Sequence, residues 1–165
     1  KDKTIAVTTS GRLDDVPLWR SNFHRGKVGS VRFSSSASNP LIASASDDGT
    51  VAVHDVRLNG MTSSLCGGSA IGVVAKLEDA HAKPHSAVWK PGSDRVFVTA
   101  GLDNIIKLWD LRNTALPVTS YHGHVPGNGK RLKRIHRPSF LDASSSSESF
   151  VLSSGEGSRA ISMYQ

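Results

Sequence analysis

The chain has 165 residues, of which 38% are hydrophobic and 21% are charged. This composition suits a single folded domain and excludes a wholly disordered chain, because there is enough apolar material for a core. The net charge of +6 favours acidic partners. The chain has a single cysteine, Cys66, which excludes an internal disulfide. No apolar stretch approaches the roughly 18 residues of a membrane helix.

Strand-like segments recur along the whole chain. In chain order they cover residues 5–10, 16–19, 28–33, 41–57, 85–89, 96–112, 149–154 and 159–164. Asp48-Gly49 predicts a tight hairpin turn within 41–57, because glycine accepts positive φ angles and aspartate bonds its local backbone. Asp103-Asn104 predicts a similar turn within 96–112. The sequence therefore predicts an all-β chain of short antiparallel strands.

Segments 41–57 and 96–112 repeat one another. Each begins with an apolar run, passes through small residues and an aspartate turn, and ends in an aromatic residue or histidine, an aspartate, an aliphatic residue and an arginine. A histidine, His24 or His81, precedes the strand before each hairpin. His124 follows His81 at the roughly 40–45-residue spacing of a propeller blade. The longer interval before His81 is explained by a Gly/Ser-rich stretch over 58–71, which is expected to be a surface loop.

At these positions the sequence resembles the WD-repeat family. Gly123-His124 and Trp109-Asp110 match the two signature dipeptides of that family, and Asp48 and Asp103 match its turn aspartate. The resemblance implies a partial β-propeller of about three and a half four-stranded blades. The expected approximate blades are residues 1–22 (the end of a blade), 23–72, 73–116 and 117–165. Known propellers have typically 4–8 blades, so we expect either a longer propeller or a partner that completes the ring.

The resemblance also implies a hydrogen-bonded network in each blade, among a histidine, the turn aspartate, a strand hydroxyl and the tryptophan. The matching residues are His81, Asp103 and Trp109 in one repeat and His24 and Asp48 in the preceding one. Thr99 is the candidate hydroxyl. His54 stands in the place of the tryptophan in the preceding repeat, and the sequence leaves open whether it completes that network. The role of such residues is structural, because a buried aspartate needs partners, so we expect a protein that is not an enzyme.

The segment from Phe97 to Arg112 resembles the DWD box, which marks substrate receptors that dock on the adaptor of cullin-type ubiquitin ligases. The segment from Ile42 to Arg57 resembles it less closely. The resemblance implies that Arg57 and Arg112 project from the bottom rim of the propeller and pair with acidic or carbonyl groups of the adaptor. Asp55 and Asp110 are further candidate partner-binding residues. Arginine suits this role because its planar fork makes bidentate bonds. The alternative is a general scaffold whose repeats end in this way to cap a blade.

A basic run over residues 130–137 indicates a second binding class, nucleic acid or chromatin. Its candidate phosphate-binding residues are Lys130, Arg131, Lys133, Arg134 and Arg137. No aromatic residue for base stacking precedes Phe140, and a solvated loop is the alternative interpretation.

Cofactor and metal sites are not expected. The histidines and Cys66 lack the spacing of a zinc site, and Gly127-Asn128-Gly129-Lys130 lacks the glycine spacing and the following Ser or Thr of a phosphate-binding loop. A single unpaired cysteine suits a reducing compartment, so a nuclear or cytoplasmic location is expected. The sequence thus predicts a protein-interaction platform, with a nucleic-acid-binding or chromatin-binding module as the alternative.

Overall fold

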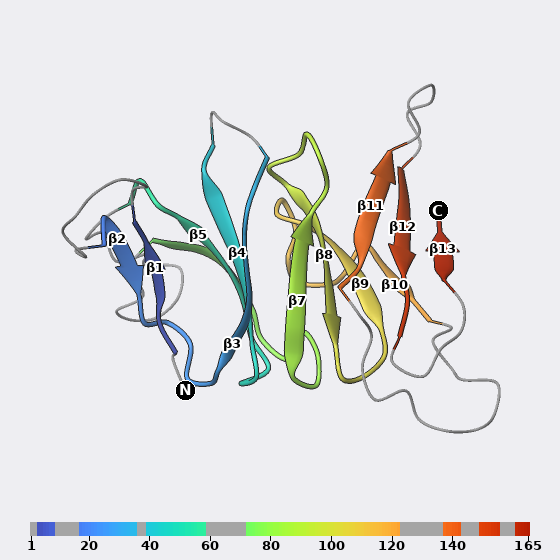
Figure 1. The fold of residues 1–165 in the computed structure, drawn as a ribbon, viewed down its shortest axis with the longest axis horizontal. Coiled ribbons are helices and arrows are strands. Elements are labelled where there is room, and N and C mark those ends of the chain that lie inside the picture. The colour runs from blue at the N-terminus through green and yellow to red at the C-terminus, as the bar shows by residue number, and fades with distance from the viewer. Residues whose placement is uncertain are drawn as a thin grey trace.

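The computed structural model describes residues 3–8, 17–35, 39–58, 72–122, 137–142, 149–155 and 161–165. Within these ranges thirteen β-strands form four antiparallel sheets, and no helix is present. The sheets stand side by side in chain order, from left to right in Figure 1. The all-β fold that the strand patterns predict is confirmed.

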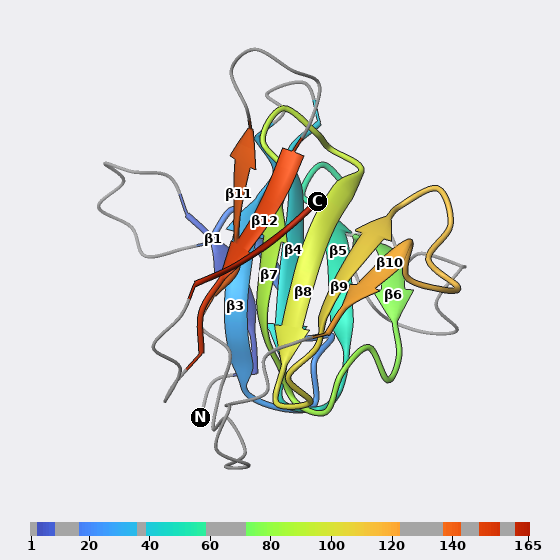
Figure 2. The same ribbon diagram turned by 90° about the vertical axis from the view of Figure 1, so that its right-hand side faces the viewer.

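Two of the sheets have four strands each, with consecutive strands as neighbours. The first full blade consists of β3 (Val28–Phe33), β4 (Leu41–Ser46), β5 (Val51–Asp55) and β6 (Val73–Leu77). The second full blade consists of β7 (Pro84–Trp89), β8 (Val96–Gly101), β9 (Ile106–Asp110) and β10 (Thr119–Tyr121). Figure 2 looks along the row of sheets and shows corresponding strands of the two blades at matching places, from β3 and β7 on one side to β6 and β10 on the other.

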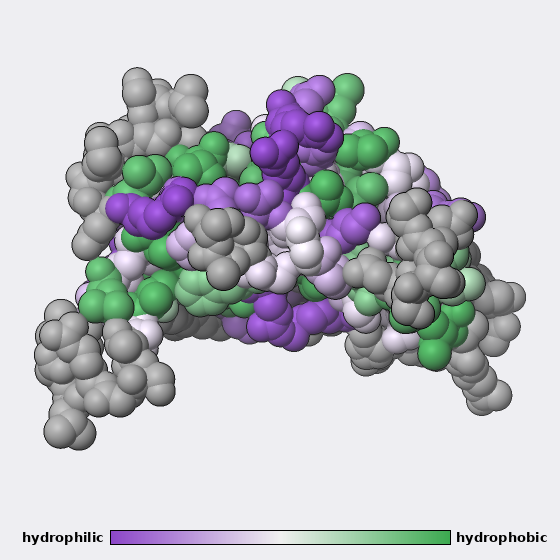
Figure 3. Space-filling view, turned by 90° about the horizontal axis from the view of Figure 1, so that it is seen from above, coloured by the Kyte–Doolittle hydropathy of each residue, from purple (hydrophilic) through white to green (hydrophobic). Residues whose placement is uncertain are grey.

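The sheets at the two ends of the row have fewer strands. One contains β1 (Ile5–Val7) and β2 (Trp19–Ser21), and the other contains β11 (Ser139–Asp142), β12 (Ser149–Ser153) and β13 (Ser162–Tyr164). Four-stranded sheets that stand next to one another in this way are the blades of a β-propeller. The structure is therefore a partial β-propeller, and Figure 3 shows it from above, with both hydrophilic and hydrophobic residues on this face.

The apolar core lies between neighbouring sheets. Every residue of β4 is buried, because its two faces are covered by different neighbours. Ala43 and Ala45 belong to a cluster that includes Phe97 of the second full blade, whereas Ile42 packs with Trp19 of the first sheet. This division follows from strand geometry, since successive side chains of a strand point to opposite faces.

Both predicted hairpins are confirmed. Strand β4 pairs with β5, and β8 pairs with β9, each in antiparallel register. Gly49 has a φ of 95° in the first turn, and Asn104 has a φ of 60° in the second. Glycine and asparagine are the residues that adopt this left-handed region most readily, so the turn chemistry and the backbone agree.

The strand patterns do not predict β6, β10 or β11, and the first two of these strands alter where a sheet ends. Strand β6 begins at Val73, the first residue of the expected blade 73–116, yet it pairs with β5 of the preceding sheet. Strand β10 lies within 117–165 and pairs with β9. The expected boundaries at 72/73 and 116/117 therefore do not coincide with the ends of the sheets, because each full blade takes its outer strand from the start of the next sequence segment. The total number of blades stays a prediction.

Candidate functional site

In the second full blade, four side chains form a chain of hydrogen bonds. Trp109 Nε1 donates to Thr99 Oγ1 at 2.8 Å, and Thr99 Oγ1 lies 2.7 Å from His81 Nε2. His81 Nδ1 lies 2.8 and 2.9 Å from the two carboxylate oxygens of Asp103. An indole only donates and a carboxylate only accepts, so a neutral His81 ring gives the chain one direction. In that state Thr99 donates to His81 Nε2, and His81 Nδ1 donates to Asp103.

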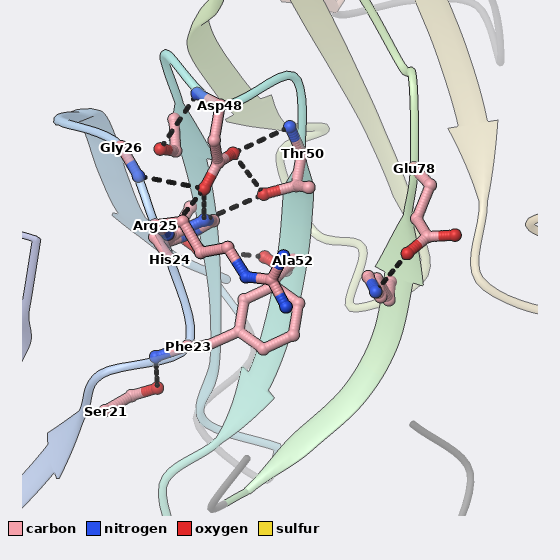
Figure 4. Close-up of polar contacts among 12 residues, drawn as sticks. Ser21, Phe23, His24, Arg25, Gly26, Asp48, Thr50, Ala52 and Glu78 are labelled. Carbon is pink, nitrogen blue, oxygen red and sulfur yellow. Dashed lines mark hydrogen bonds and ion pairs between the residues drawn. The ribbon is translucent and has the colours of Figure 1, made fainter. Parts of the chain in front are cut away.

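The first full blade has a similar chain made of different residues. His24 Nε2 lies 2.7 Å from Ser44 Oγ, and Ser44 Oγ lies 2.9 Å from His54 Nε2. On its other side, His24 Nδ1 lies 2.9 Å from Thr50 Oγ1, which donates to Asp48 Oδ1 at 2.6 Å. Figure 4 shows His24, Thr50 and Asp48 gathered at the β4–β5 turn. The histidine therefore reaches the turn aspartate through a threonine, and its own Nδ1 lies 3.7 Å from Asp48 Oδ2.

Asp48 ties the β4–β5 turn to the loop that precedes β3. Its carboxylate accepts hydrogen bonds from the backbone N–H groups of Arg25 at 2.7 Å and Gly26 at 3.1 Å (Figure 4). A Cβ at Gly26 would lie 2.6 Å from the Asp48 backbone nitrogen, so this close approach requires glycine. Burial opposes ionisation of Asp48, but the hydrogen bonds, first those from Thr50, outweigh burial and lower the pKa of Asp48 to about 2.

His54 takes the position that Trp109 occupies in the other blade. Its side chain is fully buried, and this burial, together with the nearby His24, lowers the pKa of His54 to about 3. His54 is therefore neutral at pH 7, and Nε2–H donates to Ser44 as the indole N–H of Trp109 donates to Thr99. The ring also packs edge-on against Trp19 of β2, with the ring centroids 5.4 Å apart. His54 thus links the first full blade to the preceding sheet.

Ser44 and Thr50 are the two network members that sequence reasoning missed. A signal for Ser44 was available, because Ser44 aligns with Thr99 when segment 41–57 is placed on segment 96–112. Thr50 aligns with Ile105, which has no hydroxyl, so the repeat does not point to it.

The side chains of His24 and His81 are shielded from solvent and hold fixed partners. A substrate could not contact these rings without opening the blade, so the networks stabilise the fold. Within the described ranges no group of three His, Cys, Asp or Glu side chains is arranged to hold a metal ion. Cys66 and His124 lie outside the described residues. None of the described segments forms a helix long and apolar enough to span a membrane.

At the other end of each full blade, an arginine folds back on the aspartate two residues before it. Arg57 donates from Nε to Asp55 Oδ1 at 2.9 Å and from Nη2 to Asp55 Oδ2 at 2.5 Å. Arg112 donates from Nε to Asp110 Oδ1 at 3.0 Å and from Nη2 to Asp110 Oδ2 at 2.5 Å. Each aspartate also accepts the backbone N–H of its arginine at 2.9 Å. The two pairs therefore share one geometry, in equivalent places of the two repeats.

The arginine is the exposed member of each pair. The side chains of Arg57 and Arg112 are 54% and 72% exposed, whereas those of Asp55 and Asp110 are 9% and 15% exposed. The hydrogen bonds from the arginines lower the pKa of both carboxyl groups, that of Asp110 to about 2. Each pair is thus ionised and close to neutral as a unit. Among the described residues, Nη1 of Arg112 makes no hydrogen bond, which leaves N–H donors for a partner.

The basic run is mostly outside the part of the chain that the structure describes. Lys130, Arg131, Lys133 and Arg134 fall in the undescribed segment 123–136. Arg137 is described and exposed, and it stands just before Pro138 and β11. Contact between this run and nucleic acid stays a prediction.

Residues 16–55 and 73–110 match the WD40 family, described as "WD domain, G-beta repeat". These two segments contain the His24 and His81 networks and both aspartates that pair with the exposed arginines. The matches end at Asp55 and Asp110.

Several curated proteins are similar to the chain. "Protein transport protein sec13" of Aspergillus oryzae is 33% identical over 64% of this chain and 35% of its own length. "U5 small nuclear ribonucleoprotein 40 kDa protein" of Dictyostelium discoideum is 28% identical over 74% of this chain and 30% of its own length. "Ribosome biogenesis protein WDR12 homolog" of Ixodes scapularis is 28% identical over 75% of this chain and 35% of its own length. The chain spans about a third of the length of these relatives.

Replacing Thr99 with valine tests the network of the second full blade. Valine keeps the shape but lacks the hydroxyl, so Trp109 Nε1 and His81 Nε2 lose their shared partner while they stay buried. We expect the free energy of unfolding to fall by about 2–4 kcal/mol, since an orphaned buried polar group costs ~1–3 kcal/mol. Thr99→Ser is the matched control, because it keeps the hydroxyl and removes one methyl group, at a cost of ~1 kcal/mol. Chemical denaturation measures both variants, and equal stability of the two would contradict the network's role.

Replacing His54 with tryptophan tests the effect of a buried neutral histidine on stability at low pH. Its pKa is 6.5 in the unfolded chain and about 3 in the folded chain. Between these values the unfolded chain binds more protons, so stability decreases as pH falls from 6.5 towards 3, by ~1.4 kcal/mol per pH unit from this group. Tryptophan keeps an N–H donor for Ser44 but does not titrate, so we expect a shallower loss. Denaturation curves at several pH values measure the slope, and a slope equal to that of the unmodified chain would refute the assignment.

Proposed function

Because residues 16–55 and 73–110 are WD repeats, we propose that this chain is a protein-interaction platform that docks on the adaptor of a cullin-type ubiquitin ligase. The observation that supports this function is the repeated Asp-x-Arg geometry at one end of both full blades. It presents two exposed guanidinium groups, those of Arg57 and Arg112, each held by its own aspartate. A side chain that is already ordered loses less conformational entropy when it is buried in an interface.

The N–H groups of Arg112 that face away from Asp110 set the chemistry that a partner must supply. In Arg112, the Nε and Nη2 groups bind Asp110, so the remaining N–H donors suit a carbonyl or carboxylate oxygen of the adaptor. Arg57 and Arg112 are each paired with an aspartate, so neither pair adds net charge to this end of the molecule. Docking through these pairs would therefore rely on short-range hydrogen bonds and would depend only weakly on salt concentration.

A general scaffold without any link to a ubiquitin ligase remains the alternative within the same class. It would use the same rigid blades to hold other proteins, and the arginines would then serve to cap the ends of β5 and β9. The two possibilities differ in one measurable property, which is whether the adaptor binds the chain through this end.

Removing both exposed arginines tests the docking function. The double variant R57A/R112A should lose affinity for the adaptor by at least about 30-fold, since truncating an interface hot spot costs ~2 kcal/mol or more. Arg25→Ala is the matched control, because Arg25 is an exposed arginine near the opposite end of the first full blade. Titration calorimetry measures the affinity, with thermal denaturation to check that the variants fold. Undiminished binding by the folded double variant would refute docking through these residues.

The second candidate function is binding to nucleic acid or chromatin through residues 130–137. Two observations favour it, namely the net charge of +6 and the concentration of basic residues in this one stretch. Arg57 and Arg112 each have an aspartate two residues before them, but none of the basic residues in 130–137 does. Contacts between such residues and phosphates release counterions and would depend strongly on salt.

Reversing the charge of Lys130, Arg131, Lys133 and Arg134 tests this second function. In the unmodified chain the affinity for a duplex DNA or RNA should fall steeply as the salt concentration rises. In a plot of log affinity against log salt concentration, each phosphate neutralised should add about −0.9 to the slope. The charge-reversed variant should show a much flatter dependence. Fluorescence anisotropy at several salt concentrations measures the slope, and a flat slope in the unmodified chain would rule this function out.

A further inference from the structure

A side-chain bridge joins the two full blades beside the arginine pairs. Asn39 stands two residues before β4, and Asp94 stands two residues before β8, so the two occupy equivalent places in the repeats. Asn39 Oδ1 accepts a hydrogen bond from Arg57 Nη2 at 2.7 Å, and Asn39 Nδ2 donates to Asp94 Oδ2 at 3.0 Å. The Asn39 amide therefore accepts a hydrogen bond from Arg57 of its own blade and donates one to Asp94 of the next blade.

The bridge continues to the backbone next to the second arginine pair. Arg95 Nε lies 3.8 Å from Asp94 Oδ1, which places opposite charges side by side in this loop. The carbonyl of Arg95 accepts the backbone N–H of Leu111 at 2.9 Å, and Leu111 directly precedes Arg112. A continuous series of polar contacts and covalent bonds thus runs from the guanidinium of Arg57 to the segment that carries Arg112.

Two further hydrogen bonds join the two full blades near these loops, one between the loops and one between β7 and β3. The backbone N–H of Gly92 donates to Ser35 Oγ at 2.8 Å. The indole N–H of Trp89, whose side chain belongs to the core between the blades, donates to the carbonyl of Arg32 at 3.0 Å. The loop before β4 therefore has a fixed place relative to the loop before β8. Because Asn39 also accepts a hydrogen bond from Arg57, it holds the Arg57 side chain in place relative to these loops.

We propose that Asn39 and Asp94 are positioning residues that set Arg57 relative to Arg112, so that the two blades form one docking surface. This inference rests on the proposed function, since the partner is the same adaptor, presenting two oxygen acceptors at a matching separation. Asp55 already limits the rotamers of Arg57, and the hydrogen bond to Asn39 limits them further, which reduces the entropy lost on binding. Asp55 holds the guanidinium within its own blade, and Asn39 ties it to the neighbouring blade.

The chemistry of the bridge makes it sensitive to the exchange of an amide for a carboxylate. Alanine at position 39 removes both hydrogen bonds. A carboxylate at position 39 would still accept from Arg57, but it would face the carboxylate of Asp94 and repel it. The double exchange N39D/D94N restores the contact, because the new amide donates to the new carboxylate. The two single variants and the double exchange therefore separate the bridge from a general effect of mutation.

Affinity for the adaptor is the first measurement. N39A and N39D should each bind about 3- to 10-fold more weakly than the unmodified chain, and N39D/D94N should return to within about twofold of it. In an R57A background, N39A should have no further effect, because its role is to position Arg57. An equal loss of affinity with and without Arg57, or no loss at all in N39A, would overturn the proposal.

The second measurement uses the free chain and does not need the adaptor. Rotation about the Cζ–Nη bonds of Arg57, measured by NMR, should be several-fold faster in N39A than in the unmodified chain, and N39D/D94N should slow it again. The rotation in Arg112 serves as the internal control. If the unmodified chain does not bind the adaptor, the proposed function fails and the proposed docking surface fails with it. An unchanged rotation rate of Arg57 in N39A would overturn the bridge itself.

Discussion

Two buried hydroxyl groups, those of Ser44 and Thr99, hold the full blades together from within. Each stands on the second strand of its blade, between a histidine from the loop before the blade and a ring from the third strand. A hydroxyl can donate one hydrogen bond and accept others, so it satisfies two ring nitrogens at once. Without it both rings would be buried with unpaired nitrogens, which costs more than leaving them in water.

The same hairpin carries the buried network at its turn and the arginine pair at its far end. Trp109 and Asp110 are adjacent, so their side chains point to opposite faces of β9. Trp109 is anchored inside by Thr99, and this anchoring fixes the direction of Asp110, which in turn holds Arg112. His54 and Asp55 repeat the relation in the first full blade. Packing of the interior and presentation of the exposed guanidinium are therefore linked through two neighbouring residues.

Sequence reasoning reached the features that each repeat contains within itself. The β4–β5 and β8–β9 hairpins follow from alternation and turn residues, which act over short distances along the chain. It missed β6, β10 and β11, because short strands with partly exposed residues lack a clear alternating pattern. It also missed the bridge between Asn39 and Asp94, since this contact joins loops of different blades and depends on how the sheets stack. Such contacts are set by packing between repeats, which no pattern within one repeat records.

We propose that the end of the blades carrying Arg57 and Arg112 is a protein-docking surface. Hydrogen exchange of the chain, free and with the cullin-ligase adaptor, tests it most directly, because it shows which backbone segments a partner protects. We expect protection of residues 55–58, 92–95 and 110–113, with the turns at 47–50 and 102–105 unchanged. Protection of those turns alone, with the arginine end unchanged, would contradict it.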